Sequence, residues 1–120
     1  MLLGKPRNEL TAADIREICH RFDEGLRIEY KRELNRDVKE SLPAVVSSFA
    51  NSYGGLLIIG VNAKNGKPIE PIEGFDKPGR EELPLTVENI CHGNIYRLLI
   101  PLTTEVKSDI PGKVFLVVEV

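Results

Sequence analysis

The stretch that most constrains the fold is SSFANSYGGLLIIGV, residues 47–61. A segment with helical spacing meets two adjacent glycines, and an uninterrupted aliphatic run follows at once. A helix that reverses into a strand within two residues needs a left-handed position at its C-terminal end, which glycine adopts at little steric cost. We therefore predict a positive φ at Gly54, as the C′ residue, and close packing of the helix end on the sheet at Gly55.

The aliphatic run at residues 56–61 predicts a strand that is buried on both faces. Its side chains are apolar in both alternating directions, the pattern of a central strand covered on two sides. Helices of β-α-β units are expected to cover one side. The other side then requires the N-terminal helix, a second subunit or a further domain.

Before this stretch, the chain predicts a helix and a strand. Thr11 and Asp14 form a capping box ahead of an apolar stripe with helical spacing. Residues 26–31 alternate between apolar and charged side chains, as in a half-buried strand that points Leu26 inward. The following helix is expected to begin after Ser41 as its N-cap, with Pro43 in its first turn.

After the stretch, the sequence predicts a turn at Asn65-Gly66 and a short return strand near 69–72. A third helix and two strands follow, and the two strands are expected to form a hairpin around 110–112. The order α-β-α-β-(β)-α-β-β predicts an α/β fold, a two-layer sandwich with a mixed sheet. The crossover between the first two strands should make them parallel.

The chain of 120 residues has the length of a single domain, residues 1–120. Its last predicted strand extends to the final residue, Val120, so we expect an N-terminal fragment of a longer protein. No apolar run is long enough to span a membrane, and the N-terminus lacks the pattern of a signal peptide. These observations predict a cytoplasmic location without membrane contact.

The cysteines predict no metal site. Cys19 and Cys91 each precede a histidine, but adjacent helical residues point about 100° apart and would chelate zinc poorly. Two reduced thiols in a cytosolic core are the favoured interpretation. The two GxxxxG spacings, at 55–60 and 74–79, lack the Lys-Ser/Thr that a phosphate-binding loop requires, so no nucleotide cofactor is predicted.

Seven basic side chains are candidates for phosphate contacts, although the net charge of −2 excludes a globally basic surface. Acidic residues are interspersed among those of the first group, so the residues alone also fit a solvated, charge-balanced face. The candidates are Arg27, Lys31, Arg32, Arg36 and Lys39, with Lys64 and Lys67 on the Asn65-Gly66 turn extending the same surface.

Three blocks of sequence resemble the Schlafen AlbA_2 domain family. They are IEYK at 28–31, LPAVVSSFANSYGGLLIIGVN at 42–62 and IEGF at 72–75, and the resemblance covers roughly residues 24–120. The resemblance implies an Alba-like fold and a DNA-binding role, often at the N-terminus of larger proteins described as transcriptional regulators. With it, we favour binding over the solvated-face interpretation.

Some eukaryotic Schlafen members cleave tRNA and rRNA with three acidic residues, and the resemblance maps two of them onto Glu24 and Glu29. The third falls on Asn62 and Ala63, neither of which is an acid. Mg²⁺ or Mn²⁺ in such a nuclease needs anionic oxygen ligands. We therefore predict no catalytic and no metal-binding residues, and a nucleic-acid-binding module of a transcriptional regulator that is non-catalytic by itself.

Two other functions stay open at this point. One is a divergent metal-dependent ribonuclease that uses Glu24 and Glu29, and the other is a protein-interaction module without a nucleic-acid role. The expected partners are DNA or RNA, bound through the phosphate backbone, and a homodimer or a contact with a downstream domain.

Overall fold

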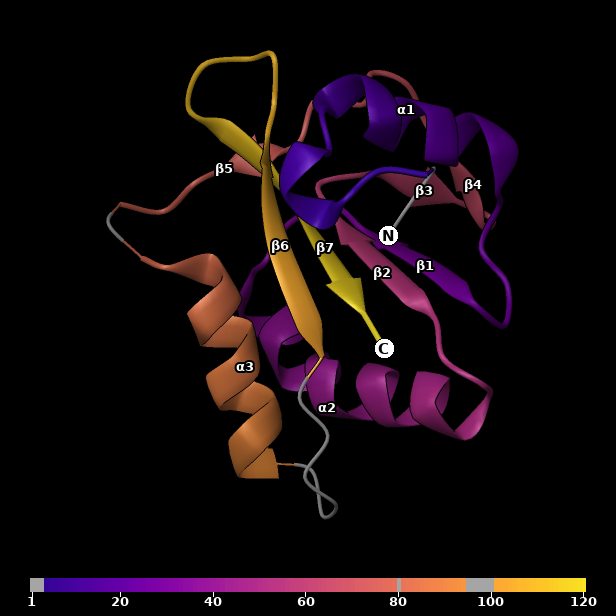
Figure 1. The fold of residues 1–120 in the computed structure, drawn as a ribbon, viewed down its shortest axis with the longest axis vertical. Coiled ribbons are helices and arrows are strands. Elements are labelled where there is room, and N and C mark those ends of the chain that lie inside the picture. The colour runs from indigo at the N-terminus through magenta and orange to yellow at the C-terminus, as the bar shows by residue number, and fades with distance from the viewer. Residues whose placement is uncertain (1–3, 80, 95–100) are drawn as a thin grey trace.

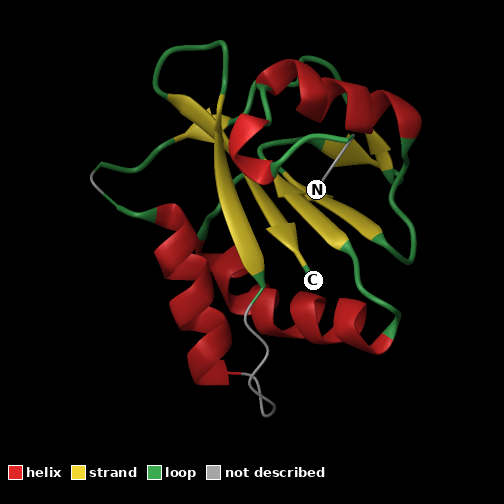
Figure 2. Ribbon diagram, in the orientation of Figure 1, coloured by secondary structure: helices red, strands yellow, loops and turns green. Residues whose placement is uncertain are grey.

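The structure, a computed structural model, describes residues 4–79, 81–94 and 101–120. In chain order its elements are η1 (Arg7–Glu9), α1 (Ala12–Arg21), β1 (Ile28–Lys31), α2 (Arg36–Asn51), β2 (Leu56–Ile59), β3 (Ala63–Lys64), β4 (Lys67–Pro68), β5 (Phe75–Asp76), α3 (Leu83–Asn94), β6 (Leu102–Lys107) and β7 (Lys113–Glu119). The helices surround a central twisted sheet, and the small β3–β4 hairpin lies apart from it (Figures 1 and 2).

The central sheet is mixed. Its order is β1-β2-β7-β5, with β6 also paired to β7. The strands β1 and β2 are parallel, with Ile28 opposite Leu56, whereas β7 runs antiparallel to β2, β5 and β6. The predicted α/β class, the mixed sheet, the parallel first pair and the C-terminal hairpin are therefore confirmed.

Two apolar clusters lie on opposite faces of the sheet. The helices α2 and α3 pack on one face and form the helical layer of the sandwich, and α1 lies across the other face (Figure 1). In β2, Leu57 and Ile59 belong to the first cluster and Ile58 to the second, and all three are fully buried. The prediction of a strand buried on both faces is confirmed, and the N-terminal helix supplies the second cover.

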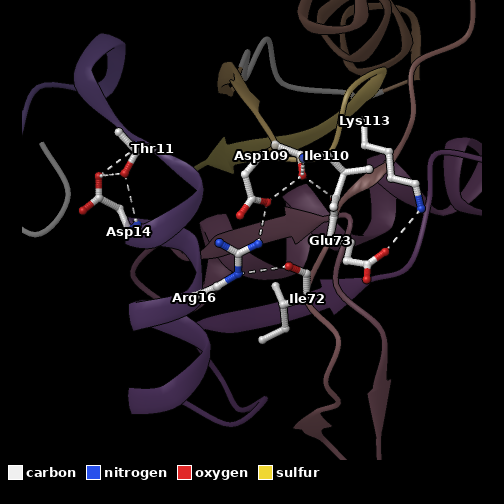
Figure 3. Close-up of polar contacts among 9 residues, drawn as sticks. Thr11, Asp14, Arg16, Ile72, Glu73, Asp109, Ile110 and Lys113 are labelled. Atoms are coloured by element: carbon white, nitrogen blue, oxygen red, sulfur yellow. Dashed lines mark hydrogen bonds and ion pairs between the residues drawn. The ribbon is translucent and has the colours of Figure 1, made fainter.

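The capping box at the start of α1 is present as predicted. The Thr11 hydroxyl accepts a hydrogen bond from the Asp14 amide at 3.4 Å, and the Asp14 carboxylate accepts from the Thr11 amide at 2.9 Å (Figure 3). The reciprocal bonds satisfy two of the amides that a helix N-terminus leaves without internal partners.

The start of α2 differs from the prediction. The helix begins at Arg36, because Asn35 caps it and its side chain accepts a hydrogen bond from the Val38 amide at 2.9 Å. Ser41 is therefore not the N-cap, and Pro43 lies inside the helix, where one intrahelical hydrogen bond is given up. Pro43 was expected in the first turn, but the cap that sets the start of the helix is Asn35, eight residues earlier.

The corner after α2 contains two successive residues with positive φ. Gly54 has φ +91°, as predicted, but Tyr53 with φ +69° occupies the C′ position that was expected for Gly54. The Gly54 amide donates back to the Phe49 carbonyl at 2.7 Å, which is the Schellman arrangement. A Cβ at Gly54 would lie 2.5 Å from the Val120 carbonyl oxygen, and one at Gly55 would lie 2.3 Å from the Phe49 ring, so both positions require glycine.

The hairpin β3–β4 turns at Asn65 and Gly66, whose φ values of +53° and +78° suit a two-residue turn. The return strand is Lys67–Pro68 and not the predicted segment near 69–72. Helix α3 and the β6–β7 hairpin lie where they were predicted, apart from residue 80 and residues 95–100, which fall outside the described residues.

Candidate nucleic-acid interface

The seven predicted phosphate-binding side chains lie on three parts of the fold. They are on and beside β1 (Arg27, Lys31, Arg32), in the first turns of α2 (Arg36, Lys39) and on the β3–β4 hairpin (Lys64, Lys67). The hairpin tip folds back to the turn that precedes β1, where the Glu24 amide donates to the Gly66 carbonyl at 2.7 Å. This bond joins the hairpin to the segment that precedes β1, so these two parts of the chain lie next to each other.

Three of the seven side chains already have an acidic partner. Lys31 pairs with Glu29 at 3.3 Å, Arg36 with Glu40 at 3.1 Å, and Lys39 with Glu81 at 3.4 Å. The charges of these three residues are thus partly compensated within the chain.

The other four are exposed, and none of them has a carboxylate within ion-pair distance in the described residues. These four, Arg27, Arg32, Lys64 and Lys67, are named the β1-edge surface. Among the other lysines and arginines that the structure describes, only Lys107 is also exposed and without a carboxylate within ion-pair distance. Four of the five exposed lysines and arginines without a carboxylate partner in the described residues thus lie on the β1 segment and on the hairpin bonded to it.

Arg36 and Lys39 contribute to a different feature. They line a groove of about 560 Å³ between α2 and α3, together with Glu40, Pro43 and Ile90. The extension of α2 to Arg36 places both cations on this helix, whereas the prediction had them in a loop after β1. Arg36 and Lys39 therefore belong to this groove, whereas their spacing in the sequence had predicted one surface shared with the cations of β1.

Glu24 and Glu29, the two acids that the resemblance singled out, lie at one pocket of about 390 Å³. Each has a structural partner: a Glu24 carboxylate oxygen accepts a hydrogen bond from the Tyr30 amide at 3.4 Å, and Glu29 pairs with Lys31. The structure thus brings the two carboxylates to one site beside the β1-edge surface.

The residues present do not fit the three-acid metal site of nucleolytic Schlafen members. Asn62 and Ala63 follow β2 where the third acid would stand. Within residues 4–79, 81–94 and 101–120, no group of three or more His, Cys, Asp or Glu side chains is arranged to hold a metal ion.

The zinc interpretation of the cysteines does not hold. Cys19 lies in the cluster under α1 and Cys91 in the cluster under α2 and α3, on opposite faces of the sheet. Burial raises the pKa of the Cys19 thiol to about 12 and also raises that of Cys91. Both are buried free thiols, as the favoured interpretation predicted.

Two exposed side chains escaped the sequence reasoning. Leu26 was predicted to point inward from a strand, but β1 begins only at Ile28 and Leu26 is 84% exposed. Tyr53 is 93% exposed at the corner after α2. The glycine before Leu26 was the available signal that the strand starts late, whereas no periodicity distinguishes Tyr53.

A curated relative of the chain is Poxin-Schlafen from Cowpox virus (strain Brighton Red). The two are 33% identical over 104 residues, which is 87% of this chain and 19% of that protein, so the chain spans about a fifth of the relative's length. No solved structure matches the chain significantly. In the described part of the chain, no helix has the length and apolar character that a transmembrane span requires.

The similarity to Poxin-Schlafen contradicts the prediction that the domain is not an enzyme. That prediction depended on the missing third acid alone. Glu24 and Glu29 entered it only through the alternative ribonuclease function, whereas the structure brings both carboxylates to one pocket. The prediction is wrong on this comparison and is withdrawn.

A family model for the Schlafen AlbA_2 domain matches residues 24–120. The matched range begins at Glu24 and includes the β1-edge surface, the pocket beside it and the whole central sheet. It leaves out α1, the helix that covers the second face of the sheet. The match associates the chain with nucleic acids at the level of the family. The chain belongs to the Schlafen AlbA_2 family.

Proposed function

We propose that the domain binds DNA or RNA through the phosphate backbone, on the β1-edge surface. The observation that carries this proposal is that Arg27, Arg32, Lys64 and Lys67 are exposed and have no carboxylate partner among the described residues. An unpaired cation that contacts a phosphate releases counterions from the nucleic acid and breaks no existing ion pair.

The charge distribution supports a local mode of binding. The net charge is −2, so long-range attraction by the whole molecule is absent and the affinity depends on this cluster. Contacts to phosphates fix the position of a nucleic acid without reading its sequence. We further propose that the domain serves as a module of a longer regulatory protein, the role that the family resemblance implies.

The test is a fluorescence-anisotropy titration of labelled 30-mer RNA and DNA at 50 and 200 mM KCl. We expect the affinity to fall steeply with salt, and the double variant R27Q/K64Q to bind at least about tenfold more weakly at 50 mM. K107Q is the matched control, because Lys107 is also unpaired but lies on β6. A salt-independent affinity, or an equal loss in K107Q, would contradict the proposal.

A second candidate function is phosphodiester cleavage at the same place. The observation in its favour is that Glu24 and Glu29 line one pocket beside the cations that would hold the substrate. Because the three-acid metal site does not fit, we assign no step to a metal here.

A cleavage assay on 5′-labelled RNA, with Mg²⁺, with Mn²⁺ and with EDTA, tests the second candidate. Cleavage that is lost in E29Q and retained in E33Q, an exposed acid at the start of the β1–α2 connection, would support it. Intact RNA under all three conditions, with binding retained, would reject this candidate and leave the first.

A further inference from the structure

The pocket beside β1 has the wrong charge for a phosphate. Its polar lining includes two carboxylates, and the lining contains no lysine or arginine. A phosphate group entering it would meet the Glu24 carboxylate and the Glu29 carboxylate that is paired with Lys31, whereas the unpaired cations lie outside it. The lining includes Glu24, Leu26, Ile28, Glu29, Ser48 and Phe49. Whatever the pocket accepts must therefore offer hydrogen-bond donors and apolar surface.

A nucleobase has this chemistry. Its two faces are apolar and suit apolar residues of the lining such as Leu26, Ala44 and Val45, while its edge carries amino groups that carboxylates accept, as in contacts to cytosine. The volume of about 390 Å³ lies within the range of small-molecule sites. The pocket thus matches the base of a nucleotide, and the β1-edge surface matches its phosphate.

Tyr53 adds a stacking surface at the same end of the sheet. It is 93% exposed, and its φ of +69° is that of the C′ residue in the Schellman turn at the end of α2. Its neighbour Ser52 lines the pocket, and the Leu56 amide donates to the Arg27 carbonyl at 2.8 Å, which holds the corner beside Arg27. Proteins that bind single-stranded nucleic acid combine a cationic surface with aromatic rings on which unpaired bases stack.

From these three observations we infer that the domain takes single-stranded nucleic acid, with one unpaired base in the pocket beside β1 and another stacked on Tyr53. This inference rests on the proposed function, because the β1-edge surface holds the phosphates between the bases. A base inside a duplex is paired and stacked and does not reach a pocket without being flipped out. The site therefore discriminates against duplexes.

The test compares the affinities of a single-stranded 20-mer and of the duplex of the same sequence, for wild type and four variants. Y53G removes the ring and suits the positive φ, and Y53F keeps the ring. S48F fills the pocket without changing charge, and N89F places the same side chain on the exposed face of α3 as its control. Thermal melting of each variant verifies that it is folded.

We expect wild type to bind the single strand at least about fivefold more tightly than the duplex, the lower end of what one stacked base contributes. Y53G and S48F should remove this preference, whereas Y53F and N89F should keep it. Equal affinity for both ligands, or a preference that persists in Y53G and S48F, would overturn the inference. If the single strand and the duplex bind equally and with steep salt dependence, the proposed function stands without it. Absence of salt-sensitive binding overturns both.

Discussion

Two polar regions of the molecule use the same residue types in opposite ways. At the junction of α1 with the β6–β7 turn, Arg16 donates to the Asp109 carboxylate at 2.7 Å and to the Ile72 carbonyl at 3.2 Å (Figure 3). Ser108 donates to the Glu73 carbonyl at 2.6 Å close by. We call these residues the clasp. On the β1-edge surface, the cations have no such partners in the described part of the chain.

The difference separates charges that hold the fold together from charges that are available to a ligand. The clasp joins three segments that lie far apart in the sequence, α1, the residues before β5 and the β6–β7 turn. Its charges are satisfied within the protein. Exposure alone does not distinguish the two regions, since Asp109 is as accessible as a surface carboxylate. What distinguishes them is whether a charged side chain has a partner within the protein.

The largest expected effect is on binding, when all four cations of the β1-edge surface are changed to Gln. We expect a loss of affinity on the order of a hundredfold or more at 50 mM KCl, and a salt slope about three units shallower, since each phosphate contact contributes about 0.7 to 0.9. Anisotropy titrations across a salt series measure both.

The control for this variant is its stability. Because none of the four side chains has an ion pair within the described residues, the free energy of unfolding in urea should change by no more than about 0.5 kcal/mol. A large loss of stability would show that these cations have structural roles after all, and the contrast with the clasp would fail.

The next effect is on stability, from Gly54→Val at the corner beside the β1-edge surface. A β-branched residue at φ +91° is strained, and its Cβ would approach the Val120 carbonyl to 2.5 Å. We expect a loss of about 2 kcal/mol or more in urea unfolding. An unchanged transition midpoint would mean that the corner adapts and does not fix the position of Tyr53.

A smaller effect is expected in the clasp itself. Arg16→Met removes the ion pair to Asp109 and leaves the Ile72 carbonyl without its donor, at a cost of about 1 kcal/mol. Binding of nucleic acid should be unchanged. Weaker binding in a variant that remains folded would show that the two regions are coupled, and Arg16→Lys, which keeps the charge but not the planar fork, would then tell whether charge is the cause.

The smallest effect concerns pH. The hydrogen bond from Arg16 holds the pKa of the Asp109 carboxyl below its usual value of 3.8. The folded-state pKa is therefore the lower one, so the stabilisation is complete above pH 4 and is lost as the pH falls through that lower pKa. Urea midpoints from pH 5 to pH 2.5 should decline less in Asp109→Asn than in wild type. Asp23→Asn, outside the clasp, should follow the wild-type decline.

The parts of the fold that local sequence determines were predictable. The Thr11 capping box, the helix that ends ahead of Gly54 and the twice-buried strand after it all follow from spacing over a few residues. The start of α2 was not predictable, because Pro43 favours a helix that begins near Ser41 whereas Asn35 caps one that begins at Arg36. Only the packed structure decides between these two starts. Leu26 was predicted to point inward because the alternation of apolar and charged residues extends back to position 26, whereas the pairing of β1 with β2 begins only at Ile28.

The candidate site was predictable only as a set of residues. Spacing identified the seven cations and, with the family resemblance, Glu24 and Glu29. Which cations are paired depends on contacts such as Lys39 with Glu81, 42 positions apart, that no local pattern contains. The pocket beside β1 is likewise formed by the turn before β1 and the far half of α2, two segments that only the fold brings together.

The turn at Glu24 and Gly25 has a consequence for solubility. β1 is the outermost strand on its side of the sheet, and an open strand edge is a template on which a second chain can add and aggregate. Here Gly25 donates to the Ile28 carbonyl at 3.1 Å and Glu24 accepts from the Tyr30 amide. Two outward-facing backbone groups of β1, the Ile28 carbonyl and the Tyr30 amide, are thereby occupied. An acid that the family resemblance associates with cleavage thus also covers part of the strand edge to which a second chain would add.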